Sequence, residues 1–142
     1  NASIYDDYAH HPSEIKASYE IAKQLAENKI IIIFQPHRYS RTANLMEHFW
    51  SAFHDADFLI VTDIYPAGES PIQGVDSSRI AEGVKNYGHK KVEYIDSFEN
   101  IASYLENVIE LGDVLVTLGA GNIGEFSRRL ASKLFTLSDQ PG

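Results

Sequence analysis

The sequence predicts an α/β fold: a Rossmann-like, doubly wound and mostly parallel sheet of five or six strands, flanked by helices. Two observations support this class. Five apolar runs of strand length alternate along the chain with stretches whose apolar residues recur at helical spacing, a pattern typical of parallel sheets. Three of these runs, at residues 30–34, 58–62 and 114–118, are almost wholly apolar and do not alternate, as expected for strands covered on both faces. A chain of 142 residues is enough for one such domain.

The first two strand-helix units are clear from spacing. A short strand over residues 2–5 ends at two acids, and a helix with one apolar stripe runs from Pro12 to about Asn28. The strand at 30–34 ends at a proline, and a second helix carries its apolar residues over 42–53. Both helices are therefore expected to cover the sheet with one face.

The third unit contains the longest loop. The strand at 58–62 leads through this loop into a shorter helix, which Asp76 or Ser77 is suited to cap. The next strand, at 92–95, alternates apolar and polar residues. It is therefore expected to lie nearer an edge of the sheet.

The last two helices complete the domain. Asp96 and Glu99 have the spacing of a capping box, and the apolar stripe of the fourth helix follows over 98–109. A glycine-rich turn after the last strand opens the fifth helix. We expect one domain over residues 1–135 and a disordered tail over 136–142, which has no apolar pattern.

Composition narrows the possible function classes. The net charge is −8 with only 12 Lys and Arg residues, so the chain is a poor partner for a nucleic-acid backbone. Cysteine is absent, which removes thiolate catalysis and cysteine-based zinc sites and fits a reducing cytoplasm. No run of 18 apolar residues and no signal-peptide pattern occurs, so we expect no membrane partner and a cytoplasmic location.

Unusual polar clusters follow the predicted strands at the points where the strands end. Residues 5–12 are Tyr-Asp-Asp-Tyr-Ala-His-His-Pro, residues 35–41 are Gln-Pro-His-Arg-Tyr-Ser-Arg, and a glycine-rich turn occupies 119–124. The carboxyl ends of parallel strands meet at one edge of a sheet, where ligands of such folds bind. We therefore expect a functional site at this edge.

His10 and His11 immediately precede Pro12, a residue suited to the first position of a helix. Histidines there can donate to an anion or orient a nucleotide, and Asp7 and Tyr8 share the turn, so we interpret the cluster as functional. The structural alternative is that one histidine caps the helix and the other faces solvent. A metal site is a further alternative, but adjacent histidines rarely bind one ion, so we predict no metal ligands.

His37, Arg38 and Arg41 form the second candidate cluster. Arg38 and Arg41 are three residues apart around a helix start, so they can face the same way. The planar guanidinium binds carboxylate or phosphate with two hydrogen bonds. In an otherwise acidic chain we interpret these residues as an anion-binding site. The alternative is that the two arginines pair with Glu47 or with neighbouring acids at the surface.

The remaining conspicuous residues favour structural roles. His48, His54 and His89 have no partner pattern and are predicted to lie at the surface, whereas Trp50 is predicted to pack against neighbouring helices. The loop segment 63–69 is either a structured rim or a mobile lid, and the sequence leaves both possibilities open.

The glycine-rich turn at 119–124 matches the pattern G-x-G-x-x-G between a strand and a helix. A dinucleotide fingerprint normally occupies the first such turn of a domain, but this one belongs to the last unit. The glycines can instead allow a tight turn and a close approach of helix and strand. Proximity of a phosphate to the helix N-terminus is a third possibility.

Four segments in order resemble one known family. They are residues 6–12, 34–42, 62–69 and 117–123. Together they resemble the signature segments of the C-terminal domain of UDP-N-acetylmuramate–L-alanine ligases, a branch of the Mur ligases of peptidoglycan synthesis. The murein tripeptide-recycling ligases, a sister branch, share the first segment and remain the alternative within the family.

The resemblance implies a three-domain enzyme that uses ATP and Mg²⁺. An acyl-phosphate on the carboxyl group of UDP-N-acetylmuramate is the intermediate, and L-alanine is the acceptor. This chain would be the third domain, acting beside N-terminal and central domains. By similarity, catalysis falls to His10, His37, Arg38 and Arg41, and substrate or nucleotide binding to Asp7, Tyr8, His10, Arg38 and Arg41.

Two features that the whole enzyme would need are missing from this sequence. The sequence contains no G-x-x-x-x-G-K-[ST] loop, which cradles ATP phosphates, and no UDP-binding domain. We therefore expect an excised domain that begins near its natural boundary, is inactive alone and binds no cofactor tightly. The alternatives of another class are a free-standing nucleotide-binding module that uses the glycine turn and a purely structural docking domain.

Overall fold

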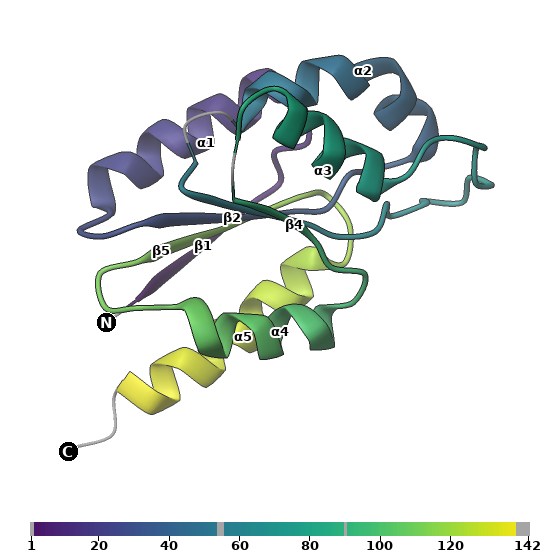
Figure 1. Cartoon of the computed structure of the whole chain (residues 1–142). Coiled ribbons are helices and arrows are strands. Elements are labelled where there is room, and N and C mark those ends of the chain that lie inside the picture. Colours follow the sequence, from purple (N-terminus) through teal and green to yellow (C-terminus); the bar gives the residue numbers. More distant parts are fainter. Residues whose placement is uncertain (1, 54–55, 90, 139–142) are drawn as a thin grey trace.

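The computed structural model describes residues 2–53, 56–89 and 91–138, the last five by their backbone alone. Five strands and five helices alternate along these residues (Figure 1). This alternation confirms the predicted α/β class. Within the described part of the chain, no helix is both long enough and apolar enough to cross a membrane.

All five strands form one parallel sheet in the order β1-β5-β2-β3-β4. The strands are β1 (Ser3–Asp7), β2 (Ile30–Phe34), β3 (Phe58–Val61), β4 (Val92–Tyr94) and β5 (Val114–Leu118). β5 comes last in the chain but lies between β1 and β2 and pairs with both. β4 is an edge strand, as its alternating sequence predicted.

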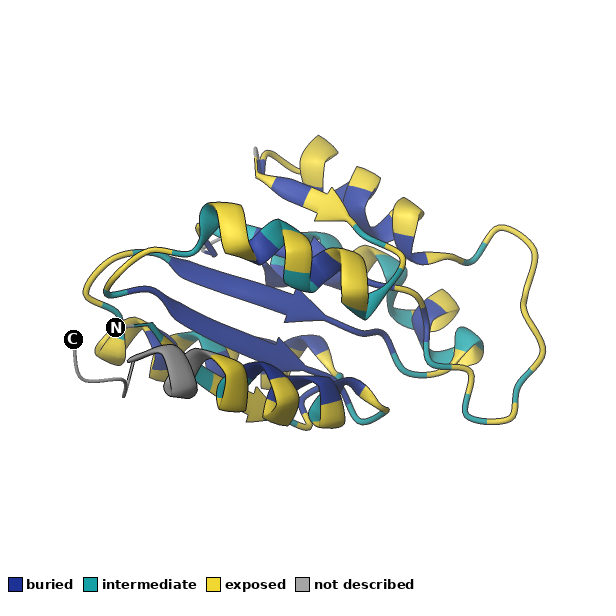
Figure 2. Cartoon of the chain, turned by 90° about the horizontal axis from the view of Figure 1, so that it is seen from below, coloured by how far each residue is buried: buried dark blue, intermediate teal, exposed yellow. Residues whose placement is uncertain are grey.

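The helices cover both faces of this sheet. They are α1 (Pro12–Leu25), α2 (Tyr39–Ala52), α3 (Ser77–Asn86), α4 (Phe98–Val108) and α5 (Ile123–Ser138). Figure 1 shows α1, α2 and α3 on one face and α4 and α5 on the other. The sheet is therefore doubly wound, as predicted, and Figure 2 shows its central strands buried between helices whose outer sides are exposed.

The apolar run of β2 supplies the core on both faces. Because side chains alternate along a strand, Ile32 and Phe34 pack towards α1, α2 and α3, whereas Ile31 and Ile33 pack towards α4 and α5. The ring of Phe34 lies 5.1 Å from that of Phe49 on α2. This two-sided burial is the physical reason why residues 30–34 show no alternation in the sequence.

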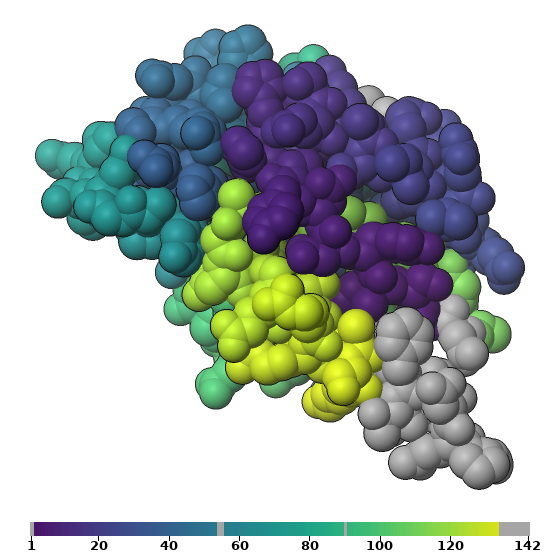
Figure 3. Space-filling model, turned by 180° about the vertical axis from the view of Figure 1, so that it is seen from behind, coloured from purple at the N-terminus to yellow at the C-terminus, as the bar shows by residue number. Residues whose placement is uncertain are grey.

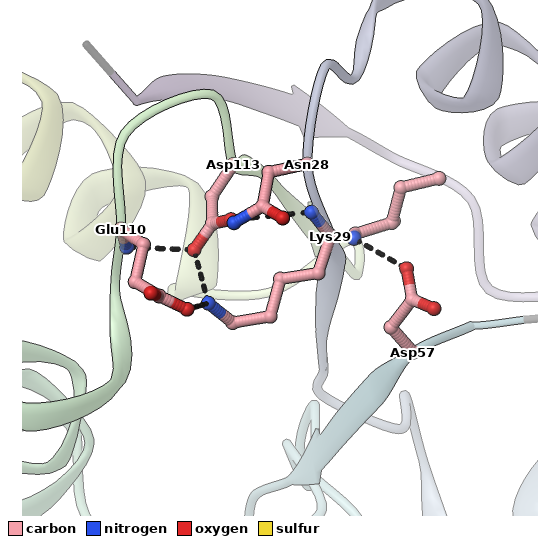
Figure 4. Close-up of polar contacts among 6 residues, drawn as sticks. Asn28, Lys29, Asp57, Glu110 and Asp113 are labelled. Atoms are coloured by element: carbon pink, nitrogen blue, oxygen red, sulfur yellow. Dashed lines mark hydrogen bonds and ion pairs between the residues drawn. The ribbon is translucent and has the colours of Figure 1, made fainter.

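A polar network lies at the amino ends of β2 and β5, at the edge of the sheet opposite the polar clusters. The buried carboxylate of Asp113 accepts hydrogen bonds from Asn28 Nδ2 (2.8 Å), Lys29 N (3.2 Å) and Glu110 N (2.7 Å). Lys29 Nζ lies 2.7 Å from both Asp113 Oδ2 and Glu110 Oε1. Figure 4 shows this network beside Asp57, which accepts a bond of 2.8 Å from the first amide of β2. Asp113 thus joins the turn before β2 to the turn before β5.

Several element boundaries differ from the sequence prediction. β1 continues through Asp6 and Asp7, since both pair with β5, and α1 ends at Leu25 instead of near residue 28. The N-cap of α4 is Ser97, whose hydroxyl accepts from Asn100 N at 3.2 Å, and not Asp96. α5 runs to Ser138, into the segment predicted as a disordered tail; residues 139–142 lie outside the described part of the chain.

Three histidines were predicted to lie at the surface, and the structure corrects one of these predictions. His89 is buried: its Nε2 bonds to Ala56 O and its Nδ1 accepts from Lys91 N at 3.2 Å. The prediction that it lies at the surface was wrong, because these main-chain partners do not show in the local sequence. His48 is exposed as predicted, and His54 lies outside the described residues. Trp50 packs against Gly83 of α3, in agreement with the prediction.

Candidate functional site

The polar clusters meet at the carboxyl edge of the sheet. Gly119 N donates to Asp7 O at 3.1 Å, and Gln35 N donates to Leu118 O at 2.9 Å, so the turn after β5 touches the ends of both β1 and β2. Figure 3 shows the purple N-terminal segment, the blue start of α2, the teal loop after β3 and the lime-green turn after β5 on one face. The helices after β1 and β2 lie on one face of the sheet and α5 on the other. At this point the connections leave the sheet towards opposite faces, and ligands of doubly wound sheets bind at such points.

Asp7 holds the turn between β1 and α1. Its Oδ1 accepts from Ala9 N at 3.1 Å and its Oδ2 accepts from Ser18 Oγ on α1 at 2.5 Å. Both carboxylate oxygens therefore have partners that fix the chain between strand and helix. Tyr8, one residue later, is 75% exposed, so this turn presents an aromatic ring to whatever approaches the edge.

His11 is the N-cap of α1. Its side chain accepts from Ser13 N at 3.3 Å, and Glu14 Oε1 accepts from His11 N at 3.1 Å, which completes a capping box. The hydrogen bond from His11 N, more than any other contact, holds the pKa of Glu14 below its usual value. One histidine of the pair thus caps the helix, as the structural alternative predicted. The other, His10, turns towards the second cluster.

His10 and His37 lie next to each other although they come from different units. Their ring centroids are 6.1 Å apart and the ring planes are inclined by 43°. His10 Nδ1 lies 3.0 Å from the carbonyl oxygen of Tyr8. A carbonyl only accepts hydrogen bonds, so Nδ1 carries the proton and Nε2 is the ring nitrogen that a ligand can reach as an acceptor in the neutral tautomer.

His37 is held in a partly buried position against Tyr65. The two rings stack with centroids 5.5 Å apart and planes 13° from parallel. Burial, followed by electrostatic interaction with Arg41, His10 and Arg38, lowers the pKa of His37 below its ordinary value of 6.5. His37 is therefore neutral at pH 7, and its buried Nδ1 has no hydrogen-bond partner among the described residues.

Arg38 has a strained backbone. It is the N-cap of α2 with φ +70° and ψ +140°, a region that residues other than glycine rarely adopt and that costs about 1–3 kcal/mol. Arg38 N donates to Tyr65 O at 2.8 Å, and Arg38 O accepts from Thr42 N at 3.1 Å and Thr42 Oγ1 at 2.7 Å. These bonds hold the strained turn. Arg38 is exposed, and Arg41, in the first turn of α2, is half-buried.

The first half of the long loop is docked onto this region. Glu69 accepts from Ser40 N at 3.0 Å and from Ser40 Oγ at 2.5 Å in the first turn of α2. The hydroxyl bond is the main reason that the pKa of Glu69 is below its usual value. The Tyr94 hydroxyl donates to Asp63 at the start of the same loop. Residues 63–69 therefore form a structured rim in this conformation.

Protein side chains fill the glycine turn. Gln35 Nε2 donates to Asn122 Oδ1 at 2.6 Å, and Gln35 Oε1 accepts from Ile123 N, the first residue of α5, at 3.3 Å. The ring of Tyr65 lies against Gly121. A pocket of about 310 Å³ opens beside these groups, between the loop after β3 and the start of α4.

The structure thus brings His10, His37, Arg38 and Arg41 to one edge, as predicted, while Asp7 supports only the turn that carries Tyr8 and His10. Within the described residues, no group of three or more His, Asp or Glu side chains could hold a metal ion. Sequence reasoning missed the packing roles of Tyr65, Gln35 and Glu69. Gln35 directly follows β2, which was an available signal, whereas Tyr65 and Glu69 lie further along the loop after β3 and carry no such signal.

The pKa of His37 offers a direct check of this geometry. An NMR titration of the ring protons is expected to give a midpoint below 6.5, because burial and the neighbouring cations disfavour the imidazolium. Arg41→Gln should raise the midpoint, since it removes the charge that contributes most to the lowering, whereas Arg129→Gln on the exposed face of α5 should not. A midpoint at or above 6.5 in the unsubstituted chain would contradict the described packing.

Comparison with known proteins agrees with the sequence resemblance. The family profile described as "Mur ligase, glutamate ligase domain" matches residues 1–121. The UDP-N-acetylmuramate–L-alanine ligase of Geobacter sp. (strain M21) is 49% identical over 132 residues, which cover 92% of this chain and 29% of that protein. The corresponding ligase of Syntrophus aciditrophicus (strain SB) is 44% identical over 137 residues, covering 96% of this chain and 28% of that protein. The chain spans less than a third of the length of these curated relatives.

A solved structure supports the fold independently. The murein peptide ligase from Psychrobacter arcticus 273-4 matches with a TM-score of 0.71, over 99% of this chain and 28% of that chain. The sequence identity is 18%, so this likeness concerns the fold alone.

Proposed function

This chain belongs to the Mur ligase family as its C-terminal domain, and on that premise we propose that it is the acceptor-binding domain of a UDP-N-acetylmuramate–L-alanine ligase. The observation that carries the proposal is the meeting of His10, His37, Arg38 and Arg41 at one sheet edge of an acidic chain. The 44–49% identity to curated ligases of that specificity supports the choice of substrate. The tripeptide-recycling ligase is the alternative, which the fold likeness to murein peptide ligase leaves open.

The proposed reaction forms an amide in two steps. The γ-phosphoryl group of ATP passes to the carboxylate of UDP-N-acetylmuramate, giving an acyl-phosphate and ADP. The amine of L-alanine then attacks the carbonyl carbon, the C–O bond to phosphate breaks, and the amine gives up a proton as the amide forms. This chain's part is to bind the acceptor and to stabilise negative charge during both steps.

The arginines are suited to both kinds of anion. Guanidinium groups bind carboxylate with two parallel hydrogen bonds, so Arg38 and Arg41 would hold the carboxylate of L-alanine and the transferring phosphoryl oxygens. His37, neutral at pH 7, adds a polar ring without a third positive charge. His10 would contribute Nε2, and the exposed ring of Tyr8 would contact the nucleotide or the acceptor.

The other substrates would be held mainly by the rest of the longer protein. The sequence has no phosphate-binding loop of the G-x-x-x-x-G-K-[ST] type, and the described residues offer no metal-binding cluster. We therefore propose that ATP, Mg²⁺ and the UDP-sugar are bound chiefly by N-terminal and central domains. The proposed location is the cytoplasm, in keeping with a chain that lacks cysteine.

A comparison of the longer protein with this chain tests the proposal. The longer protein is expected to release ADP continuously only when UDP-N-acetylmuramate and L-alanine are both present, because the acyl-phosphate is not consumed without the acceptor. The 142-residue chain alone should release none. Calorimetric titration of the chain should show no sub-millimolar binding of NAD, NADP or ATP. Tight NAD binding would instead favour a free-standing module that uses the glycine turn, and L-alanine-dependent ADP release by the chain alone would contradict the proposed division of labour.

A further inference from the structure

We propose that the glycine turn at residues 119–124 serves as a socket for the ring of Tyr65, and that Tyr65 is a positioning residue for His37 and Arg38. The effect of Tyr65 on catalysis rests on the proposed function, whereas its positioning of His37 and Arg38 rests on contacts within the structure. The proposal accounts for two features that the ligase assignment leaves unexplained: the G-x-G-x-x-G pattern in the last unit and the strained backbone of Arg38.

The main chain of Tyr65 is tied to the segment after β2 on both sides. Tyr65 N donates to Pro36 O at 2.9 Å, and Tyr65 O accepts from Arg38 N at 2.8 Å. Between these bonds, His37 and Tyr65 form an isolated parallel bridge. The loop after β3 is thereby fixed to the two residues that carry the candidate imidazole and guanidinium groups.

The ring of Tyr65 is clamped between His37 and the glycine turn. One face stacks on the His37 ring at 5.5 Å. On the turn, a Cβ atom added to Gly121 would lie 2.5 Å from Tyr65 Cγ and 2.7 Å from Cδ1, closer than real carbon atoms approach. The ring fits only because residue 121 has no side chain.

Backbone conformation does not require glycine at 121. Gly121 is absent from the residues with positive φ, whereas Gly119 has φ +154° and would bring a Cβ to 2.9 Å from Gln35 O. Alanine at position 121 is therefore compatible with the main chain and changes only the space available to its neighbours. Gly124, in the same turn, would place a Cβ 3.1 Å from the end of the flexible Asp6 side chain.

The consequence of filling the socket follows from these contacts. A methyl group at position 121 forces the Tyr65 ring to move. This movement disturbs either the stack of the ring on His37 or the main-chain bonds of Tyr65 to the segment 36–38. Arg38 adopts its strained conformation with the help of one of those bonds. Small displacements of groups that orient a substrate can lower a rate by roughly 100-fold.

A double-mutant cycle in the longer protein tests the socket. Gly121→Ala is expected to lower kcat/KM for L-alanine by roughly 10–100-fold, and Tyr65→Ala by a similar factor. In the Tyr65→Ala background, Gly121→Ala should add less than about twofold, because the clashing ring is gone. Gly124→Ala and Tyr65→Phe are the controls and should remain within about twofold, since the first avoids Tyr65 and the second keeps the ring.

Two outcomes would overturn the socket. Gly121→Ala with unchanged kcat/KM would show that the ring has room to spare. An undiminished penalty in the Tyr65→Ala background would show that the added methyl group acts instead through Gln35 Oε1, which lies 2.7 Å from the same added Cβ.

An NMR titration of this 142-residue chain separates the positioning from the catalytic proposal. Tyr65→Ala should raise the pKa of His37 towards 6.5, because burial is the main cause of its lowering, and Tyr65→Phe should restore the low value. An unchanged pKa in Tyr65→Ala would overturn the positioning role whether or not the longer protein is a ligase. A pKa that responds as expected in a chain whose longer form makes no amide would leave the positioning intact and refute the proposed function.

Discussion

Replacing Arg38 or Arg41 by alanine in the longer protein is expected to lower kcat/KM for L-alanine by at least roughly 100-fold. Each substitution removes charge-assisted hydrogen bonds to an anion, which are worth about 1.5–3 kcal/mol apiece and more when water is excluded. Steady-state kinetics with L-alanine as the varied substrate is the measurement. Arg129→Ala, on the exposed face of α5, is the matched control and should leave the kinetics unchanged.

The substitution Arg38→Gly distinguishes an effect on stability from an effect on activity. Because φ +70° and ψ +140° suit glycine, Arg38→Gly should relieve strain and raise the free energy of unfolding by about 1 kcal/mol, while activity falls as in Arg38→Ala. A purely structural docking domain would behave differently: Arg38→Ala and Arg41→Ala would then both leave turnover intact.

Replacing Asp113 by alanine is expected to destabilise the chain by about 3–5 kcal/mol, the usual cost of removing one partner from a buried charged network. Asp113 is fully buried, and its loss leaves Asn28 Nδ2, Lys29 N and Glu110 N without their acceptor. Domains have total stabilities of only about 5–15 kcal/mol, so this is a large fraction. Urea unfolding followed by circular dichroism measures it.

Asp57 provides the matched comparison for Asp113. It is an exposed acid whose Oδ2 accepts one bond of 2.8 Å, from the amide of Ile30, beside the same network (Figure 4). Asp57→Ala should therefore cost about 1 kcal/mol. Equal losses for the two substitutions would show that the burial of Asp113 is not what makes its network stabilising.

The fold was predictable because the pattern that encodes it is local. Residues 30–34 are apolar at every position, and the structure buries them between two helical layers. The insertion of β5 between β1 and β2 could not be derived from the sequence in the same way, because strand order depends on which turns and faces fit together. The helix α4 is capped by Ser97 instead of Asp96. The sequence could not distinguish these adjacent residues, because Asp and Ser have similar capping ability.

The candidate site was predictable in part. His10, His37, Arg38 and Arg41 are conspicuous because charged and titratable residues directly follow strand ends. Tyr65 was not conspicuous, since its importance comes from stacking on His37 and packing against Gly121, contacts between three turns that are far apart in the chain. The catalytic roles of the four residues remain predictions for the experiments above.

We propose that this domain belongs to a ligase whose acceptor is L-alanine. The most direct test is product analysis by mass spectrometry, after the longer protein has been incubated with ATP, UDP-N-acetylmuramate and equal concentrations of L-alanine and murein tripeptide. We predict that UDP-N-acetylmuramoyl-L-alanine is the dominant product and that Arg38→Ala abolishes most of it. Preferential formation of the tripeptide conjugate, or no amide product with either acceptor, would contradict the assignment of L-alanine as the acceptor.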